Sequence, residues 1–576
     1  MRRYLGWTAA VALATTIAIG VVTGLATDLA RTVLDWATAR LRPEDAMACV
    51  TRETPLPPQP DTALFRVAVT YLPNDRDEEF SRLAVETLRG LYSELPGAAI
   101  DVVTVPCILR EEAGSEAEIA RRAESVAEAL ARRAHADVVI WGEVGGDRDS
   151  LDLRLSHETG TDTGEFRVAR FALPVALGEA LGPPLAARTA ALVRLSEEEA
   201  GQYTAPIFEL LRPQTAQLAT NPPPGLTEAQ RAVLVEAHAY VLFFLGRQRA
   251  EPETLRAAAA TFIIAIAGYD RSGERLAWAS AQNSLGAALL TLGVREASPA
   301  DLQSAIAAFE AALTERHSDT EPLEWAQTQL NLGIALRSLG QRESGTARLR
   351  AAIAAFEAAL TGFTRDATPI TWANTQMALG NALATLGERE GSAARLEAAI
   401  AAYDSALLEL TRDRVPFSWA ALQMNRGTAL SVLARLEPRT ARLESAVAAH
   451  RAALTVFTRD KAPNDWAMTQ SNLGNALAEI AAREPGAARI PEARAAQEAA
   501  LTVWTREAAP LQWAMTQGNL ANLALIAFDK TADPAHLDEA EAQARAAREV
   551  FVKAQAAHMV TMADRLLADI ATRRGG

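Results

Sequence analysis

The sequence is poor in cysteine and in lysine. Its two cysteines, Cys49 and Cys107, are too few for a disulfide framework or a cysteine-based zinc site. They are either independent thiols or one bridge, which an oxidising compartment would allow. With three lysines among 576 residues, the chain carries a formal net charge of −14. Nucleic-acid-binding proteins usually present a basic face, so this balance argues against that class.

Motifs that carry chemistry are also missing. No lysine follows a phosphate-loop glycine pattern, and GEVGGD (142–147) leads into a strand, so it is interpreted as a hairpin turn. The seven histidines are scattered, without HExxH, and no GxSxG elbow occurs. We therefore expect no enzyme activity, no metal and no cofactor. The alternative is a site assembled in space at strand ends near Tyr71, Cys107 and Gly142.

A long uncharged run lies near the amino terminus, between Arg3 and Asp28. About 20 apolar residues span a bilayer, and the run exceeds the ~7–15 residues of a cleaved signal. We predict a transmembrane anchor at 1–28, then a juxtamembrane helix and Pro-rich linker at 29–63. The basic tail favours a single-pass inner-membrane protein with its bulk outside the cytoplasm. Arginines at 31, 40 and 42 compete with that tail, so the cytoplasmic side stays open.

Residues 64–174 alternate between strand and helix patterns. Runs typical of buried or half-buried strands occur at 65–72, 99–107, 136–144, 150–157 and 165–173, with helical patterns at about 77–95 and 115–134. The order β-α-β-α-β-β-β predicts a small mixed-sheet domain. ADVVIWGEV (136–144) followed by LDLRLSHETGTDTGEF (151–166) loosely resembles the amino-terminal domain of the Tol–Pal translocation protein. This resemblance concerns fold, not role. Residues 175–224 are expected to form a helical connector.

A repeat of 47 residues dominates the rest of the chain, marked by Trp278, Trp325, Trp372, Trp419, Trp466 and Trp513. Counting each Trp as offset 0, offset 4 is always Gln: Gln282, Gln329, Gln376, Gln423, Gln470 and Gln517. Offset 8 is Gly in five units, where a missing Cβ would admit a neighbouring helix. A Gly near offset 15 (Gly293, Gly340, Gly387) is expected to end the first helix of each unit. Each unit thus predicts two helices, and residues 225–574 predict an α-solenoid of seven helix pairs plus a capping helix.

These units resemble the tetratricopeptide repeat. NLGNAL (472–477) matches its first-helix signature, and Ala352, Phe356 and Ala359 match its second helix. Two features depart from that family: the loop between the helices is longer, and Gln replaces the usual first-helix aromatic, with Trp four residues earlier. The nearest pattern is that of a bacterial variant, P-x-x-W-A-x-T-Q-x-N-L-G-x-A-L. The resemblance implies a mainly α solenoid whose concave groove binds a protein or peptide.

Candidate binding residues occupy offsets 6 and 9, on the side of the first helix opposite the Trp face. They are Asn331, Asn381, Asn425, Asn472, Asn475, Asn519 and Asn522. An Asn amide can donate to and accept from a peptide backbone at once. The alternative is that these amides bond neighbouring turns of the repeat. We expect structural roles for the other columns: burial of the Trp rings, pairing of the Gln amides with backbone groups between helices, and ion pairs between recurring Arg and Glu residues.

The leading hypothesis is a membrane-tethered interaction scaffold that holds an unidentified protein or extended peptide in the groove of its repeats. A second hypothesis is a sensor whose α/β domain binds a small ligand while the repeats relay the signal or oligomerise. A third is purely structural assembly into a homo-oligomer.

Overall fold

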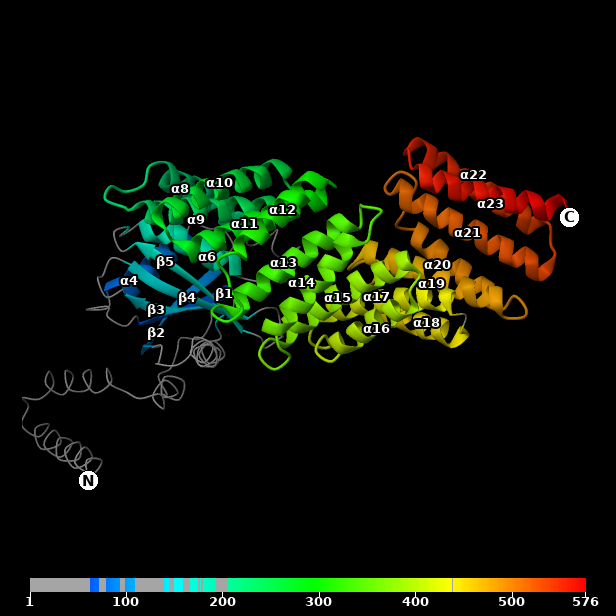
Figure 1. The fold of residues 1–576 in the computed structure, drawn as a ribbon, viewed down its shortest axis with the longest axis horizontal. Coiled ribbons are helices and arrows are strands. Elements are labelled where there is room, and N and C mark those ends of the chain that lie inside the picture. Colours follow the sequence, from blue (N-terminus) through cyan, green and yellow to red (C-terminus); the bar gives the residue numbers. More distant parts are fainter. Residues whose placement is uncertain are drawn as a thin grey trace, which may run out of the picture. The chain divides into compact units, whose positions relative to one another are not determined.

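The structure, a computed structural model, describes residues 63–71, 79–93, 99–108, 136, 138–144, 150–158, 166–174, 177, 180–192, 205–437 and 439–575. It divides into two compact units, one containing a β-sheet and one made of helices (Figure 1). The predicted membrane anchor (1–28), nearly all of the stretch at 29–63 and the helix predicted at 115–134 lie outside the described residues. Within the described ranges, no helix is both long and apolar enough to cross a membrane.

The sheet unit contains five strands: β1 (Ala63–Tyr71), β2 (Ala99–Ile108), β3 (Val138–Val144), β4 (Ser150–Glu158) and β5 (Phe166–Pro174). Their order in space is β2-β1-β3-β4-β5. β1 runs parallel to β2 and β3, whereas β3 and β4 are antiparallel, so the sheet is mixed. Helix α4 (Glu79–Ser93) lies between β1 and β2 in the chain and packs against both.

The centre of the sheet is apolar and fully buried. Val67 in β1 and Val138 in β3 have no exposed surface, as expected for strands covered on both faces. One charged pair joins the inner strand to the edge strand: the Nε of Arg66 donates to Oδ2 of Asp101 at 2.7 Å, across a register that aligns the two residues. Because Arg66 is itself buried, this pair offsets part of the desolvation cost of placing its charge within the sheet.

Two helices are described in the stretch expected to form the connector. α6 (Gly182–Leu192) packs against α4 of the sheet unit. α8 (Ala205–Thr220), with Pro213 inside it, packs against the first helix of the solenoid. The stretch therefore contributes one helix to each unit.

From residue 228 onward the described chain holds seven helix pairs and a final helix. The pairs are α9 (Glu228–Gln248) with α10 (Pro252–Ser272), α11 (Arg275–Arg295) with α12 (Pro299–Ala312), α13 (Pro322–Gly340) with α14 (Ala347–Gly362), α15 (Pro369–Glu390) with α16 (Ala393–Ala406), α17 (Pro416–Leu436) with α18 (Thr440–Leu454), α19 (Pro463–Arg483) with α20 (Ile490–Leu501), and α21 (Pro510–Thr531) with α22 (Ala535–Lys553), followed by α23 (Ala557–Gly575). Each first helix packs on its own second helix, and each second helix packs on the next first helix (Figure 1). The predicted mainly α solenoid of helix pairs is confirmed.

The first helices of the later pairs start in the same way. Proline occupies the first turn of α13, α15, α17, α19 and α21, where its fixed φ suits a helix start and its missing N–H costs nothing. A fully buried Thr follows at offset 3 in four of these helices, and its hydroxyl donates to the carbonyl four residues back, as Thr328 does to Glu324 at 2.8 Å. Burial of that polar group is thereby compensated within the helix.

The glycine at offset 8 is the contact point between the two helices of a pair. A Cβ built on Gly286 would lie 2.6 Å from Cε1 of Phe309, and one on Gly380 would lie 2.5 Å from Cε1 of Tyr403. The second-helix residue in this contact changes along the stack in the order Phe309, Phe356, Tyr403, His450 and Gln497. The close approach predicted for this glycine is therefore observed, and the residue that fills it becomes more polar toward the carboxyl end.

The prediction for the glycine at offset 15 is wrong. α11 and α15 continue past Gly293 and Gly387, and only α13 ends at its Gly340. The reason is a second close contact, because a Cβ on Gly293 would lie 2.9 Å from Cγ of Leu302, at the start of the paired helix. Gly387 faces Leu396 in the same way at 3.0 Å. These glycines admit the second helix and do not terminate the first.

The six repeat tryptophans are half-buried, not buried as expected. Four of the rings share clusters in consecutive pairs, Trp325 with Trp372 and Trp419 with Trp466. Trp325 and Trp372, for example, share a cluster with Ala359 and Phe363. The column is thus structural, but each ring loses only part of its exposed surface.

Candidate functional site

The seven predicted asparagines all lie on first helices, within a common face of the solenoid unit. We define the first-helix face as offsets 2, 5, 6 and 9 of α11, α13, α15, α17, α19 and α21. These offsets fall within about 100° of one another around a helix, while offsets 1, 3, 8 and 10 carry the most deeply buried residues. Asn475 and Asn522 are exposed, and the other five are half-buried.

Consecutive first helices lie close to one another. Each contacts the next directly from α9 to α21, whereas contacts between consecutive second helices are at most marginal in the described chain. Closer spacing of the first helices is the arrangement expected on the inner side of a curved stack. The first-helix face is therefore the side that the resemblance assigned to the groove.

Most of these asparagines form a ladder between neighbouring units. Nδ2 of Asn425 donates to Oδ1 of Asn381 at 3.1 Å, 44 residues back in the chain. Asn331 donates to Asn283, 48 residues back, at 3.1 Å. Weaker bonds of the same kind join Asn472 to Thr428 at 3.4 Å and Asn519 to Ser471 at 3.3 Å. Lateral bonds between first helices are thus one role of the column.

Two asparagines also bond to second helices. Oδ1 of Asn381 accepts a hydrogen bond from the Tyr403 hydroxyl at 2.8 Å, and Oδ1 of Asn475 accepts one from Nε2 of Gln497 at 2.8 Å. Both partners belong to the column of second-helix residues that contact the offset-8 glycines. These bonds from the second helices fix the orientation of both amides, so the amide atoms that are not bonded point in a defined direction.

The ladder leaves acceptors available on the same face. Among the described residues, nothing donates to Oδ1 of Asn425, Asn472 or Asn519, and Asn522 forms no side-chain hydrogen bond at all. Each donating amide also keeps a second N–H. The structure therefore brings the seven predicted residues together on one face, with both the lateral bonds of the alternative interpretation and spare hydrogen-bonding capacity.

The glutamines at offset 4 do not behave as expected. All six are half-buried, and none hydrogen-bonds to another residue in the described ranges, so pairing with backbone groups between helices is not seen. Half-buried amides without a protein partner are hydrated instead. These side chains lie on the Trp side of the helix, away from the first-helix face.

Basic side chains at offset 17 donate hydrogen bonds to carbonyls at the carboxyl end of the preceding first helix. This capping role was not predicted from the sequence. Arg295 donates to the Gly246 carbonyl at 2.9 Å, and Arg389 to the Gly340 carbonyl at 2.7 Å. The unpaired carbonyls and the negative end of the helix dipole favour a cation there. The signal was present in the sequence, because offset 17 is basic in five of six units: Arg295, Arg342, Arg389, Arg483 and Lys530.

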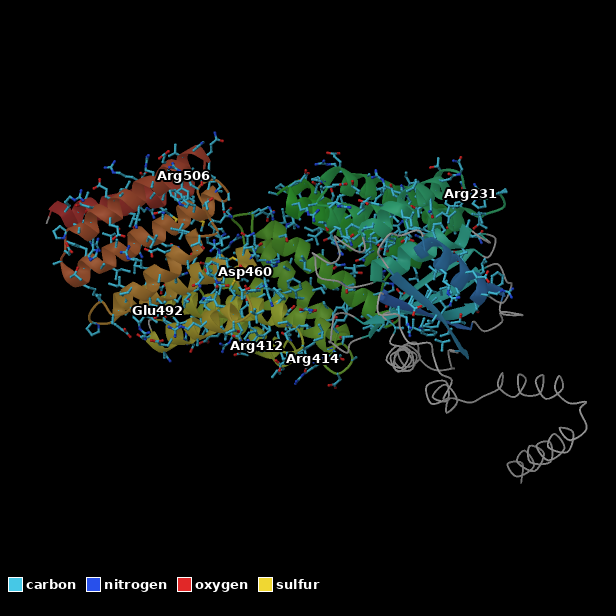
Figure 2. The ribbon with its side chains drawn as sticks, turned by 180° about the vertical axis from the view of Figure 1, so that it is seen from behind. Arg231, Arg412, Arg414, Asp460, Glu492 and Arg506 are labelled. Carbon is cyan, nitrogen blue, oxygen red and sulfur yellow. The ribbon has the colours of Figure 1, made fainter. Side chains whose placement is uncertain are left out.

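Some of the recurring Arg and Glu residues form the expected ion pairs between units, whereas Arg412 lies over the Trp419 ring and Arg459 donates to the Thr502 carbonyl. Arg365 Nε lies 2.6 Å from Glu409, and Arg506 pairs with Glu549 at 2.7 Å. Glu390, whose pKa is lowered chiefly by its hydrogen bond from Arg350, makes a second link between the units that Arg365 and Glu409 join. Figure 2 labels several such charged residues, among them Arg414, Glu492 and Arg506. Because these pairs are exposed, solvent and salt screen them, and they contribute little to stability.

Comparisons with known proteins place the chain in no family. No protein-family model and no curated protein matches it. Among solved structures, the TPR2AB domain of yeast Sti1 in complex with pHSP90 is 20% identical, with a TM-score of 0.20, over 56% of this chain and 96% of that one. A Rap protein complexed with Competence and Sporulation Factor is 10% identical, with a TM-score of 0.33, over 68% of this chain and 99% of that one.

A circular tandem repeat protein is 13% identical, with a TM-score of 0.25, over 68% of this chain and 95% of that one. Likenesses at TM-scores of 0.20–0.33 determine neither a family nor a ligand for this chain. The repeat architecture rests on the helix pairs themselves.

Proposed function

We propose that the protein is an interaction scaffold whose first-helix face binds an extended segment of another protein. The observation that supports this proposal is the run of asparagines on five consecutive pairs, α13 to α21. Three of them keep an unused acceptor, and Asn522 has its whole amide unused. An extended backbone presents alternating N–H and C=O groups, and each amide can meet both. Binding of a protein or peptide is also what the tetratricopeptide resemblance implies.

Site-specific photocrosslinking in the producing cells tests this function. A photoreactive amino acid replaces Asn522 on the first-helix face and, as a matched control, Ser445, which is exposed on the second helix α18. We expect a crosslinked partner protein at position 522 and none at position 445, identified by mass spectrometry. Equal yields at both positions, or none at 522, would contradict a binding role for this face.

A triple substitution of Asn425, Asn472 and Asn475 to alanine should reduce the crosslink at position 522 strongly. Its matched control replaces Thr361, Ser405 and Ser445, polar residues on second helices, with alanine. Circular dichroism of both proteins distinguishes loss of binding from loss of folding. A crosslink that survives the triple substitution in a folded protein would remove the asparagines from the binding site.

The membrane tether belongs to this proposal as a hypothesis from the sequence alone. We infer that residues 1–28 anchor the scaffold in the inner membrane and that the repeats face away from the cytoplasm. A reporter fused to the carboxyl terminus, active on only one side of the membrane, tests the orientation. Activity of a cytoplasmic reporter would reverse it.

A further inference from the structure

The first-helix face carries no charge. Its 24 positions, four in each of six first helices, contain no Asp, Glu, Lys or Arg, in a chain that is 22% charged overall. An average surface of this size would hold about five charged residues, since natural surfaces are rich in them. Nine of the chain's twelve asparagines and four of its eight methionines lie on this face instead. The composition is specific to the face and does not follow from the chain as a whole.

Beyond offset 9, the same side of the first helices carries charges at offsets 13 and 16, where Arg435 pairs with both Glu479 and Glu388. Glu479 lies 3.2 Å from Arg435 and 3.5 Å from Arg483. Arg426, at offset 7 on the Trp side of α17, pairs with Asp404 of α16 at 2.6 Å. The basic residues at offset 17 point into the carbonyls of the preceding helix. A ligand on the first-helix face therefore meets no unpaired charge at these positions.

An uncharged polar face selects its ligand in a defined way. A charged side chain brought onto it would lose hydration without gaining an opposite charge, which disfavours its binding when the contact excludes water. A backbone would gain hydrogen bonds to the unused amide groups of Asn425, Asn472 and Asn522. The first-helix face therefore disfavours charged ligand segments and favours uncharged ones.

Methionines complete this selection. Met377 and Met424 occupy offset 5, and Met468 and Met515 occupy offset 2, in four consecutive pairs. Met468 is 38% exposed and Met515 48% exposed, so both are accessible to a ligand. An unbranched thioether adapts its shape to different apolar side chains. The face thus offers fixed polar groups for a backbone and deformable apolar groups for its side chains.

We propose that the first-helix face binds an extended, uncharged segment of a partner protein, recognised through its backbone and its small or apolar side chains, with little dependence on salt. This inference rests on the proposed scaffold function and specifies the chemistry of its ligand. Salt screens interactions between charges and leaves neutral hydrogen bonds and apolar contacts almost unchanged. The affinity should therefore change less than about twofold over a tenfold increase in salt.

A displayed library of random twelve-residue peptides, selected on the full chain, tests the proposal. The selected peptides should be depleted at least about threefold in Asp, Glu, Lys and Arg relative to the input, because charge is excluded from the face. Selection should fail on the variant with Asn425, Asn472 and Asn475 replaced by alanine. Binding of the best peptide is then measured by fluorescence anisotropy at low and high salt.

The Asn522→Lys variant provides an independent check, because Asn522 is exposed and bonds to no described residue. It should bind the neutral peptide more weakly and gain affinity for acidic peptides, without loss of helicity. The Ser445→Lys variant on a second helix should change neither affinity.

The outcomes are distinguishable. Charged peptides that are selected and are lost in the triple variant would overturn the uncharged ligand but keep the scaffold. No selected peptide, or peptides retained by the triple variant, would overturn the scaffold as well. If the only ligand were a second copy of this chain, light scattering would show a dimer that the triple variant abolishes, and the proposal of a foreign partner would fall.

Discussion

Replacing His450 with phenylalanine should protect the solenoid from mild acid. His450 lies on α18 with no exposed surface, and neither ring nitrogen has a hydrogen-bond partner in the described chain. Burial lowers the pKa of its imidazole from 6.5 to about 4. The folded state therefore holds this ring neutral, while the unfolded state binds a proton once the pH falls below 6.5.

The sign and the magnitude of the effect follow from linkage. The contribution is fully present above pH 6.5, is lost as the pH falls from there to about 4, and is constant below that. At 1.36 kcal/mol per pKa unit, the loss between about pH 7.5 and pH 4.5 is on the order of 2–3 kcal/mol. Phenylalanine should fit, because Phe309 and Phe356 make the same contact with Gly286 and Gly333 that His450 makes with Gly427.

Hydrogen exchange read by mass spectrometry provides the assay, since it reports the opening free energy of α17 and α18 separately from the rest of the stack. After correction for intrinsic exchange rates, the wild-type protein should lose on the order of 2–3 kcal/mol more than the His450→Phe variant in these helices between about pH 7.5 and pH 4.5. Peptides from α11 and α12 serve as the internal control and should show no difference. Equal losses in the two proteins would refute the reasoning that the buried ring is kept neutral.

Four further substitutions test the packing and capping of the repeats through urea or thermal unfolding of the full chain. Gly380→Ala should destabilise the protein by about 1–3 kcal/mol, because its Cβ would lie 2.5 Å from the Tyr403 ring. Gly518→Ala, whose Cβ would meet open space, should instead stabilise the protein by about 0.5–1 kcal/mol. Equal effects of the two substitutions would contradict the close contact at Gly380. Leu436→Arg supplies the one missing basic residue at offset 17 and should raise stability by about 0.5–1 kcal/mol; a lower thermal midpoint would argue against the capping role. Trp372→Ala should cost about 2 kcal/mol, below the 3–5 kcal/mol typical of a buried ring, because the side chain is half-buried; a loss of the full amount would show that its exposure is misjudged.

The regular part of the fold could be predicted because the sequence repeats. Tryptophans 47 residues apart fix where each first helix starts, and the pairing of Gly with a large second-helix residue, as in Gly333 and Phe356, follows from one missing Cβ. The role of Gly387 could not be predicted, because a helical glycine and a terminating glycine look alike until the position of Leu396 is known.

The site was predictable in location but not in detail. The helical period placed Asn425 and Asn472 on one face, yet their partners depend on how far each first helix is shifted against the last. Asn425, at offset 6, bonds to Asn381 at offset 9 of the preceding unit. Asn331, also at offset 6, bonds instead to Asn283 at offset 5 of the preceding unit. A lateral offset of this kind is set by side-chain packing and leaves no trace in a single repeat.

The capping arginines give the stack a direction. Each pair from α11 onward, except the one beginning with α17, donates hydrogen bonds from its basic residue to the carboxyl end of the preceding first helix. Truncation from the carboxyl end would therefore remove the cap from the new last pair. Truncation from the amino end would leave the caps of all remaining pairs intact. Fraying should accordingly begin at the carboxyl terminus, and a nested set of truncations would not be symmetrical in its tolerance. Any redesign that lengthens the array should add new pairs before α23, so that the final helix still terminates the series.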